Sequence, residues 1–275
     1  MQPRRDKVHR ERIFNVPLVI LGIVGVLAAI QLICENIPPE RFLDVLQHFA
    51  FVPGRFTFAF DPDRVSDAYN AIAKQDDLHA QAARFFLGDG RPLWWTPLTY
   101  AFLHGGWLHL GMNCLWLAAF GSAVARRFGT PRFLLFYAIA AVGGAFVHFL
   151  THMTDLQPVI GASAAVSGTM AAAIRFVFQP GAPLGATLGF AQRMDDARAY
   201  RLPALPLREI FSNRPALSFL SFWFLANLLF GVAPETLGIT DASVAWQAHI
   251  GGFLIGLFAF PWFDPPEAAM GRPVE

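Results

Sequence analysis

Charged residues are scarce in this chain. Asp, Glu, Lys and Arg make up 15% of its 275 residues, whereas 55% of the residues are hydrophobic. A soluble domain has roughly 25% charged residues, so a water-soluble fold of this composition would have too few polar side chains to cover its surface. The scarcity of charge therefore excludes an ordinary soluble domain and predicts a membrane protein.

Several kinds of binding site are missing as well. The formal net charge is only +1, so no nucleic-acid partner is expected. The two cysteines, Cys34 and Cys114, have neither the spacing of metal ligands nor that of a redox pair. The sequence His-Glu-x-x-His, which marks the common zinc metalloproteases, does not occur. Neither a metal ion nor another cofactor is therefore expected.

Six apolar runs predict helices that cross a bilayer, which takes about 20 apolar residues each. The runs are Val16–Cys34, Trp107–Val124, Phe133–Leu150, Gly161–Phe178, Pro215–Val232 and Val244–Trp262. The fourth is rich in Ala and Gly and short for a full span. A basic segment precedes the first run, as in a signal peptide, but no small-residue cleavage site follows it. The predicted fold is an all-α polytopic membrane protein with six transmembrane helices.

The distribution of basic residues predicts how these helices are oriented. With the N-terminus inside, 15 of the 21 basic residues lie in or beside inner segments, and the short outer loops at 151–160 and 233–243 contain none. The positive-inside rule therefore places both termini in the cytoplasm. Residues 1–15 include Asp6 and Glu11 but no Ser, unlike a transit peptide. We expect an integral protein of a prokaryotic inner membrane.

Four regions follow from these boundaries. Residues 1–15 are a cytoplasmic basic N-terminus, and 16–89 comprise the first transmembrane helix and a long extracytoplasmic loop. Residues 90–262 form the core, and 263–275 are a cytoplasmic tail. The long loop contains Pro53–Gly54 and several phenylalanines, and we expect short helices there at the membrane surface. The cytoplasmic loop at 179–214 is expected to be partly helical.

No Asp or Glu lies inside any of the six runs. Ionisable groups within a membrane are costly and are therefore candidates for function. An aspartyl intramembrane enzyme would need two carboxylates there, so that class is excluded. Five histidines and one serine lie towards the outer side in the predicted topology: His104, His109, His148, His152, His249 and Ser163.

Ser163 and His249 are the candidate nucleophile and base. Ser163 opens the fourth run at a loop-to-helix junction of small residues, where a helix N-terminus supplies free N–H groups for a developing oxyanion. His249 is followed by Gly252 and Gly256, a small-xxx-small face that lets another helix pack closely. If that helix is the fourth, His249 can remove the proton of the Ser163 hydroxyl.

Other polar residues have competing interpretations. His109 and Asn113 are four residues apart on one helix face, and both can donate hydrogen bonds. They could also be buried polar contacts between helices. His104 is expected to be structural, and His148 with His152 an interfacial pair rather than a metal site. Three further residues are interpreted as cavity-lining or interhelical hydrogen-bonding groups: Ser167, Asn227 and Gln247.

Three motifs together resemble the rhomboid family of intramembrane serine proteases. They are Phe102-Leu103-His104-Gly105-Gly106-Trp107-Leu108-His109 with Asn113, then Gly161-Ala162-Ser163, then Ala248-His249-Ile250-Gly251-Gly252. The motifs fall in the second, fourth and sixth runs, in the family's order, and the match covers roughly residues 90–262.

The resemblance implies an intramembrane serine endopeptidase with a water-filled cavity open to the outer side. It would make Ser163 the nucleophile and His249 the base of a Ser–His dyad without an acidic third member. His109 and Asn113 would stabilise the oxyanion. Substrates of similar proteins are single-span membrane proteins in the lipid bilayer, cut near the outer end of a helix. The fifth run would form the lateral gate.

Two positions depart from the family pattern. Ala164 follows the serine where the family usually has Gly, and a methyl group there could crowd the substrate. Trp95-Thr96 stands where the first loop often has Trp-Arg. The competing hypothesis is a catalytically inactive relative that binds membrane clients, and the presence of both Ser163 and His249 argues against it. A small-molecule transporter would be expected to have acidic intramembrane residues and repeat symmetry.

Overall fold

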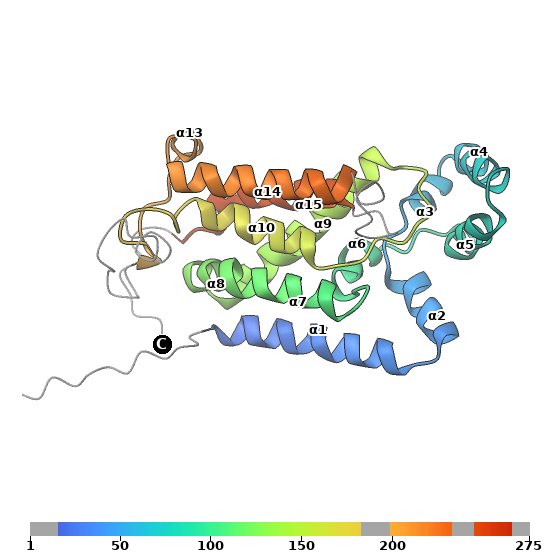
Figure 1. The fold of residues 1–275 in the computed structure, drawn as a ribbon, viewed down its shortest axis with the longest axis horizontal. Helices are drawn as coiled ribbons and strands as arrows, with labels where there is room; N and C mark the ends of the chain where they lie inside the picture. Colours follow the sequence, from blue (N-terminus) through green and yellow to red (C-terminus); the bar gives the residue numbers. More distant parts are fainter. Residues whose placement is uncertain (1–15, 183–198, 233–244, 266–275) are drawn as a thin grey trace, which may run out of the picture.

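The computed structural model describes residues 16–182, 199–232 and 245–265, and the regular structure of these ranges is helical (Figure 1). The all-α class predicted from the sequence is confirmed there. Four predicted segments lie wholly or mostly outside the described residues: the N-terminus at 1–15, part of the loop at 179–214, the outer loop at 233–243 and the tail at 263–275.

Each of the six predicted runs contains a helix. The helices are α1 (Leu18–Asn36), α7 (Trp107–Trp116) continuing through η2 (Leu117–Gly121) into α8 (Ser122–Phe128), α9 (Thr130–Thr151), α10 (Ser163–Ile174), α14 (Arg214–Val232) and α15 (Trp246–Phe263). Three segments are long and apolar enough to cross a membrane: Leu18–Asn36, Trp107–Phe128 and Thr130–Thr151. Helix α10 is a shorter apolar helix. The crossing of a membrane by α10, α14 and α15 stays a prediction.

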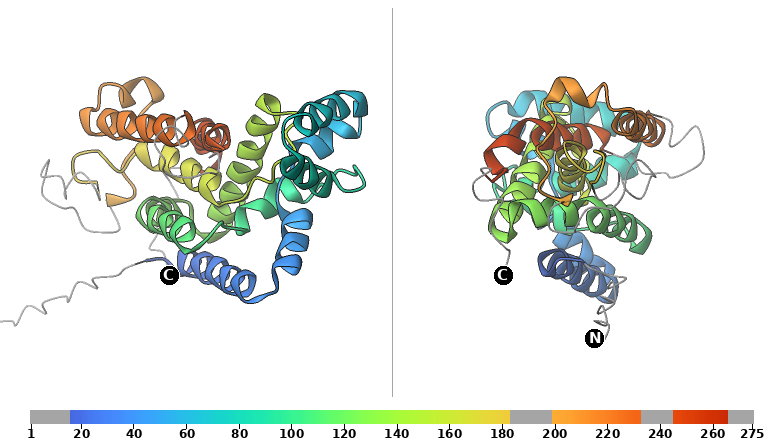
Figure 2. Two further views of the ribbon diagram at one scale, coloured as in Figure 1. Left: turned by 45° about the vertical axis from the view of Figure 1, so that its right-hand side comes forward. Right: turned by 90° about the vertical axis from the view of Figure 1, so that its left-hand side faces the viewer.

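Helix α10 is the centre of the bundle. Every residue from Ala164 to Ile174 is buried, and the end-on view in Figure 2 shows α10 surrounded by the other long helices. Ala, Gly and Ser make up most of its sequence, and such small side chains let neighbouring backbones approach closely. The Ala- and Gly-rich composition of the fourth run is therefore that of a helix enclosed on all sides by others.

Helices α10 and α15 approach each other closely. A methyl group built on Gly252 would overlap the backbone carbonyl of Ala164, and one built on Gly256 would overlap that of Gly168. No side chain separates the two helices at these positions. The small-xxx-small face predicted on the sixth run therefore packs on the fourth run, as the proton-transfer hypothesis required.

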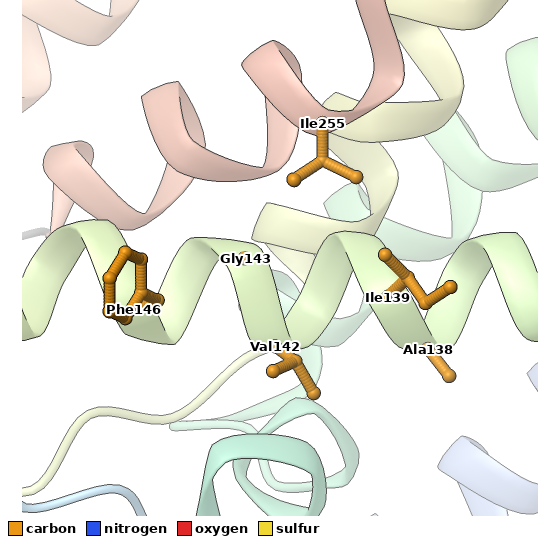
Figure 3. Close-up of a pocket in the computed structure, with 6 residues that line it drawn as sticks. All are labelled: Ala138, Ile139, Val142, Gly143, Phe146 and Ile255. Carbon is orange, nitrogen blue, oxygen red and sulfur yellow. The ribbon is translucent and has the colours of Figure 1, made fainter. Parts of the chain in front are cut away.

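Helices α1 and α14 lie at the edge of the bundle (Figure 1). Only Ile20, Leu27 and Gln31 of α1 are buried, and Phe222 and Leu225 of α14 are about 60% exposed. A shallow apolar groove on the surface of α9 and α15 shows the same outward-facing character (Figure 3). It is lined by Ala138, Ile139, Val142, Gly143, Phe146 and Ile255. Outer faces this apolar suit a lipid environment.

The long first loop is folded. It contains α2 (Pro39–Phe49), α3 (Pro53–Phe58), α4 (Pro62–Ala73) and α5 (Asp77–Leu87), followed by α6 (Thr96–Thr99) and η1 (Tyr100–Phe102). Buried Arg55 ties this loop together, because its guanidinium donates to the carbonyls of Gln47 and Leu87 at 2.9 and 3.1 Å. Trp95 donates its indole N–H to the carbonyl of His48 at 2.8 Å. Short helices were expected here and are present, and their position at the membrane surface stays a prediction.

A buried ion pair closes the opposite end of the bundle. The Arg127 guanidinium, at the end of α8, donates to both carboxylate oxygens of Asp264 at 2.6 and 2.8 Å and to the carbonyl of Leu202 at 2.7 Å. It therefore joins the ends of α8 and α15 to the segment before α13 (Leu207–Ile210). Breaking such a buried pair on one side leaves an uncompensated charge.

Candidate active site

Ser163 is the first residue of α10, and its loop is held in place by two hydrogen bonds. Gly161 has a φ of 122°, a conformation that side chains strongly disfavour, and its N–H donates to the carbonyl of Tyr100 at 3.0 Å. The N–H of Ala162 donates to Nε2 of His104 at 3.3 Å. The structural role expected for His104 is therefore to fix the residue that precedes the serine.

His249 reaches Ser163 across the α10–α15 contact. Its Nε2 lies 2.7 Å from the Ser163 hydroxyl oxygen, a hydrogen-bond distance. The two residues are 86 positions apart in the chain, and the glycine face of α15 brings them together because no side chains hold the helices apart. Ser163 and His249 are both half-buried residues.

The other ring nitrogen of His249 is also bound. Its Nδ1 lies 2.6 Å from Oδ1 of Asn227 on α14. The sequence predicted Asn227 to be an interhelical hydrogen-bonding group, and that bond is present. What the sequence did not indicate is its partner, because nothing in the spacing of 22 residues singles out His249. The partner at Nδ1 is an amide and not a carboxylate.

His109 and Asn113, one turn apart on α7, lie beside this pair. The N–H of Gly105 donates to Nδ1 of His109 at 3.3 Å, so in the neutral ring Nε2 carries the proton and is a donor. A methyl group built on Gly161 would lie 2.9 Å from that Nε2 and 3.6 Å from the Ser163 hydroxyl oxygen. The missing side chain of Gly161 therefore leaves space between the imidazole donor and the hydroxyl.

One of the two N–H groups of the Asn113 side chain is already used in a hydrogen bond. Its side chain is buried, and its Nδ2 donates to the carbonyl of His109 at 3.0 Å, within the same helix. A primary amide has two N–H groups, so one donor remains available. The role expected for Asn113 therefore depends on this second N–H.

The methyl group of Ala164 faces Gly144 of α9. Ala164 is 1% exposed. A methyl group built on Gly144 of α9 would come within 2.4 Å of the Cβ of Ala164. The methyl group of Ala164 therefore fits only because Gly144 has no side chain. The departure from the family's usual Gly therefore fills space between α10 and α9.

His148 and His152 form a second pair of histidines. The rings of His148 and His152 are stacked at 4.7 Å, and Gln247 Nε2 lies 3.4 Å from Nε2 of His152. Ser167 is buried in α10. Among the described residues, no group of three or more His, Cys, Asp or Glu side chains could hold a metal ion.

The arrangement suits acyl-transfer chemistry. An alcohol hydrogen-bonded to an imidazole is an activated nucleophile. The first N–H groups of a helix have no acceptor within the helix, so the start of α10 offers donors to an oxyanion beside the Ser163 hydroxyl. His109 adds a side-chain donor on the other side of the space left by Gly161.

The chain is similar to several known proteins. Residues 91–263 match the model of the Rhomboid domain. Rhomboid protease GluP of Bacillus subtilis is 40% identical over 201 residues, which are 73% of this chain and 30% of that protein. RHOMBOID-like protein 5 of Arabidopsis thaliana is 29% identical over 165 residues, or 60% of this chain and 42% of that protein.

A third relative, the putative rhomboid protease YdcA of Bacillus subtilis, is 37% identical over 82 residues, or 30% of this chain and 41% of that protein. The matched regions thus span less than half the length of each of these relatives. The family match, by contrast, covers well over half of the chain and includes α7, α9, α10 and α15. The chain belongs to the rhomboid family.

Proposed function

We propose that this protein is an intramembrane serine endopeptidase that uses a Ser163–His249 dyad. The observation that carries the proposal is the 2.7 Å contact between the Ser163 hydroxyl and Nε2 of His249 at the N-terminus of a buried helix. Membership of the rhomboid family and the similarity to a protein named as a rhomboid protease support it.

The proposed reaction has two halves. Nε2 of His249 takes the Ser163 proton as the hydroxyl oxygen attacks the peptide carbonyl, and the protonated imidazole then gives the proton to the leaving amine. Water next attacks the acyl-enzyme, with His249 again as the base, and releases the acid and Ser163. The negative oxygen of each tetrahedral intermediate would accept hydrogen bonds from the α10 N-terminus, His109 and the free N–H of Asn113.

The proposed substrates are single-span membrane proteins in the lipid bilayer. The chain's apolar helices and family make it an integral membrane protein, and the proposed arrangement has six spans, both termini in the cytoplasm of a prokaryote, and residues 90–262 as the catalytic core. Helix α14 would be the lateral gate, because its outer face is exposed and it lies at the bundle edge. A substrate helix entering there would meet Ser163 near the outer side.

Reconstitution of the full chain with single-span substrates tests this function. Ser163→Ala and His249→Ala are each expected to lower the cleavage rate at least about a thousandfold, because either change removes the activated nucleophile. Ser167→Ala, one turn further along α10, is the matched control and should cleave at a rate close to that of the unmodified protein. A fluorophosphonate should label Ser163 without a known substrate.

Two results would contradict the proposal. Equal cleavage by all four proteins would show that the dyad does not carry the reaction. If the unmodified protein neither cleaves any of a broad panel of substrates nor reacts with the fluorophosphonate, the protein is instead a rhomboid that binds membrane clients without cutting them.

A further inference from the structure

The imidazole of His249 is held on both nitrogens, and the second contact comes from the helix at the bundle edge. Nε2 faces the Ser163 hydroxyl at 2.7 Å, and Nδ1 faces Oδ1 of Asn227 at 2.6 Å. Asn227 lies on α14, whereas Ser163 lies on the enclosed helix α10. The base of the proposed dyad is thus oriented by contacts with two helices: α10, which is enclosed by the bundle, and α14, which lies at its edge.

The orientation of the Asn227 amide is set by its own helix. Its Nδ2 donates to the carbonyl of Trp223 at 2.8 Å. If the amide were turned around, Oδ1 would face that carbonyl, and two acceptors would oppose each other. The bond to Trp223 therefore directs the amide oxygen of Asn227, an acceptor, towards His249.

An acceptor at Nδ1 decides where the imidazole proton sits. A neutral imidazole carries one proton, and the nitrogen facing an amide oxygen at 2.6 Å must be the one that donates. Nδ1–H then donates to Asn227, and Nε2 keeps the lone pair that accepts the Ser163 proton. The opposite tautomer would leave Nε2 protonated and unable to act as the base.

An aromatic contact on the same side of α14 also joins it to α15. The ring of Trp223 stacks on that of Phe253 at 4.5 Å, and each lies four residues from a member of the Asn227–His249 pair. Phe224 and Leu228, which are close to Asn227 in α14, are more than half exposed. The position of the Asn227 amide therefore depends on how α14 is seated on α15.

We propose that Asn227 is a positioning residue for the reaction, the neutral counterpart of the third member of a catalytic triad. This inference rests on the proposed function. By accepting a hydrogen bond from Nδ1–H, Asn227 holds His249 in the tautomer and ring orientation that let Nε2 act on Ser163. Because Asn227 is carried by α14, a displacement of α14 from α15 removes this acceptor and lowers the competence of the dyad.

Two substitutions of similar size separate this role from ordinary packing. Asn227→Leu keeps the volume but removes the acceptor, and Asn227→Asp keeps an acceptor oxygen for Nδ1–H. With the full chain in proteoliposomes, Asn227→Leu should lower kcat at least about tenfold and leave KM within about twofold. Asn227→Asp should be at least about fivefold more active than Asn227→Leu. Leu135→Ala, on the exposed face of α9 and outside α14, should match the unmodified protein.

The alternative is that Asn227 only joins two helices. An unchanged kcat in Asn227→Leu, an effect on KM alone, or equal loss of activity in the Leu and Asp variants would overturn the positioning role. These results would leave the protease function intact as long as the unmodified protein cleaves its substrate. An unmodified protein that neither cleaves nor reacts with a fluorophosphonate would overturn both.

Discussion

Ala164 shows how the meaning of a single residue depends on where its side chain points. At the level of sequence, a methyl group beside the nucleophile threatened to crowd the substrate. In the fold, that methyl group is buried against α9, at the position where Gly144 has no side chain. The backbone N–H of Ala164 stays at the start of α10, where it is a candidate oxyanion donor.

Ala164→Gly is therefore expected to cost stability and to leave catalysis unchanged. The substitution removes a buried methyl group and adds glycine near the start of a helix, which together should lower the free energy of unfolding by about 1–2 kcal/mol. Denaturant unfolding in detergent measures the first effect, and kcat/KM with a single-span substrate measures the second. A severalfold rise in kcat/KM would show that the methyl group does obstruct the site.

At the scale of elements, the contact between α10 and α15 decides whether the site exists. Ser163 and His249 come from these two helices, and their backbones touch at Gly252 and Gly256. The sequence indicated a close-packing face on the sixth run and named the fourth as the partner that chemistry would need. The spacing of small residues is a local pattern, so the sequence was enough to predict a close-packing face. Which helix packs on that face depends on the packing of the whole bundle.

Gly252→Ala is the sharpest test of that contact. Because the added methyl group would overlap the carbonyl of Ala164, the helices must separate, and overpacking of this kind costs about 1–3 kcal/mol. Separation should also lengthen the Ser163–His249 contact and lower the rate of fluorophosphonate labelling. Gly22→Ala in α1 is the control, since nothing lies within 4 Å of the added group. Equal behaviour of the two variants would contradict the proposed role of the contact.

At the scale of the whole molecule, the long first loop and the Arg127–Asp264 pair lie at opposite ends of the bundle. The loop packs as a layer of short helices, with Asp77 exposed on α5. Arg127 and Asp264 join the ends of α8 and α15, and exposed Arg208 of α13 follows the segment that they bind. The proposed topology places the first end outside the cell and the second in the cytoplasm.

Single cysteines test this topology in intact cells. In a background with Cys34→Ala and Cys114→Ala, Asp77→Cys should react with a membrane-impermeant maleimide added outside. Arg208→Cys should react only after the membrane is permeabilised, because the positive-inside rule keeps the Arg-rich segments in the cytoplasm. A mass shift on a gel reports each reaction. The reverse pattern, or external labelling of both sites, would show that the six-span arrangement or its orientation is wrong.

The sequence alone was enough to identify the membrane class, the six helix positions and the candidate residues Ser163, His249, His109 and Asn113. These conclusions rest on composition, on the length of apolar runs and on short motifs, all of which are local properties of the chain. Only the tertiary structure decided the contacts of His104 with Ala162, of Arg127 with Asp264 and of Asn227 with His249. Each such contact depends on how two helices or loops are rotated and shifted against each other, and the packing of the whole bundle sets those rotations.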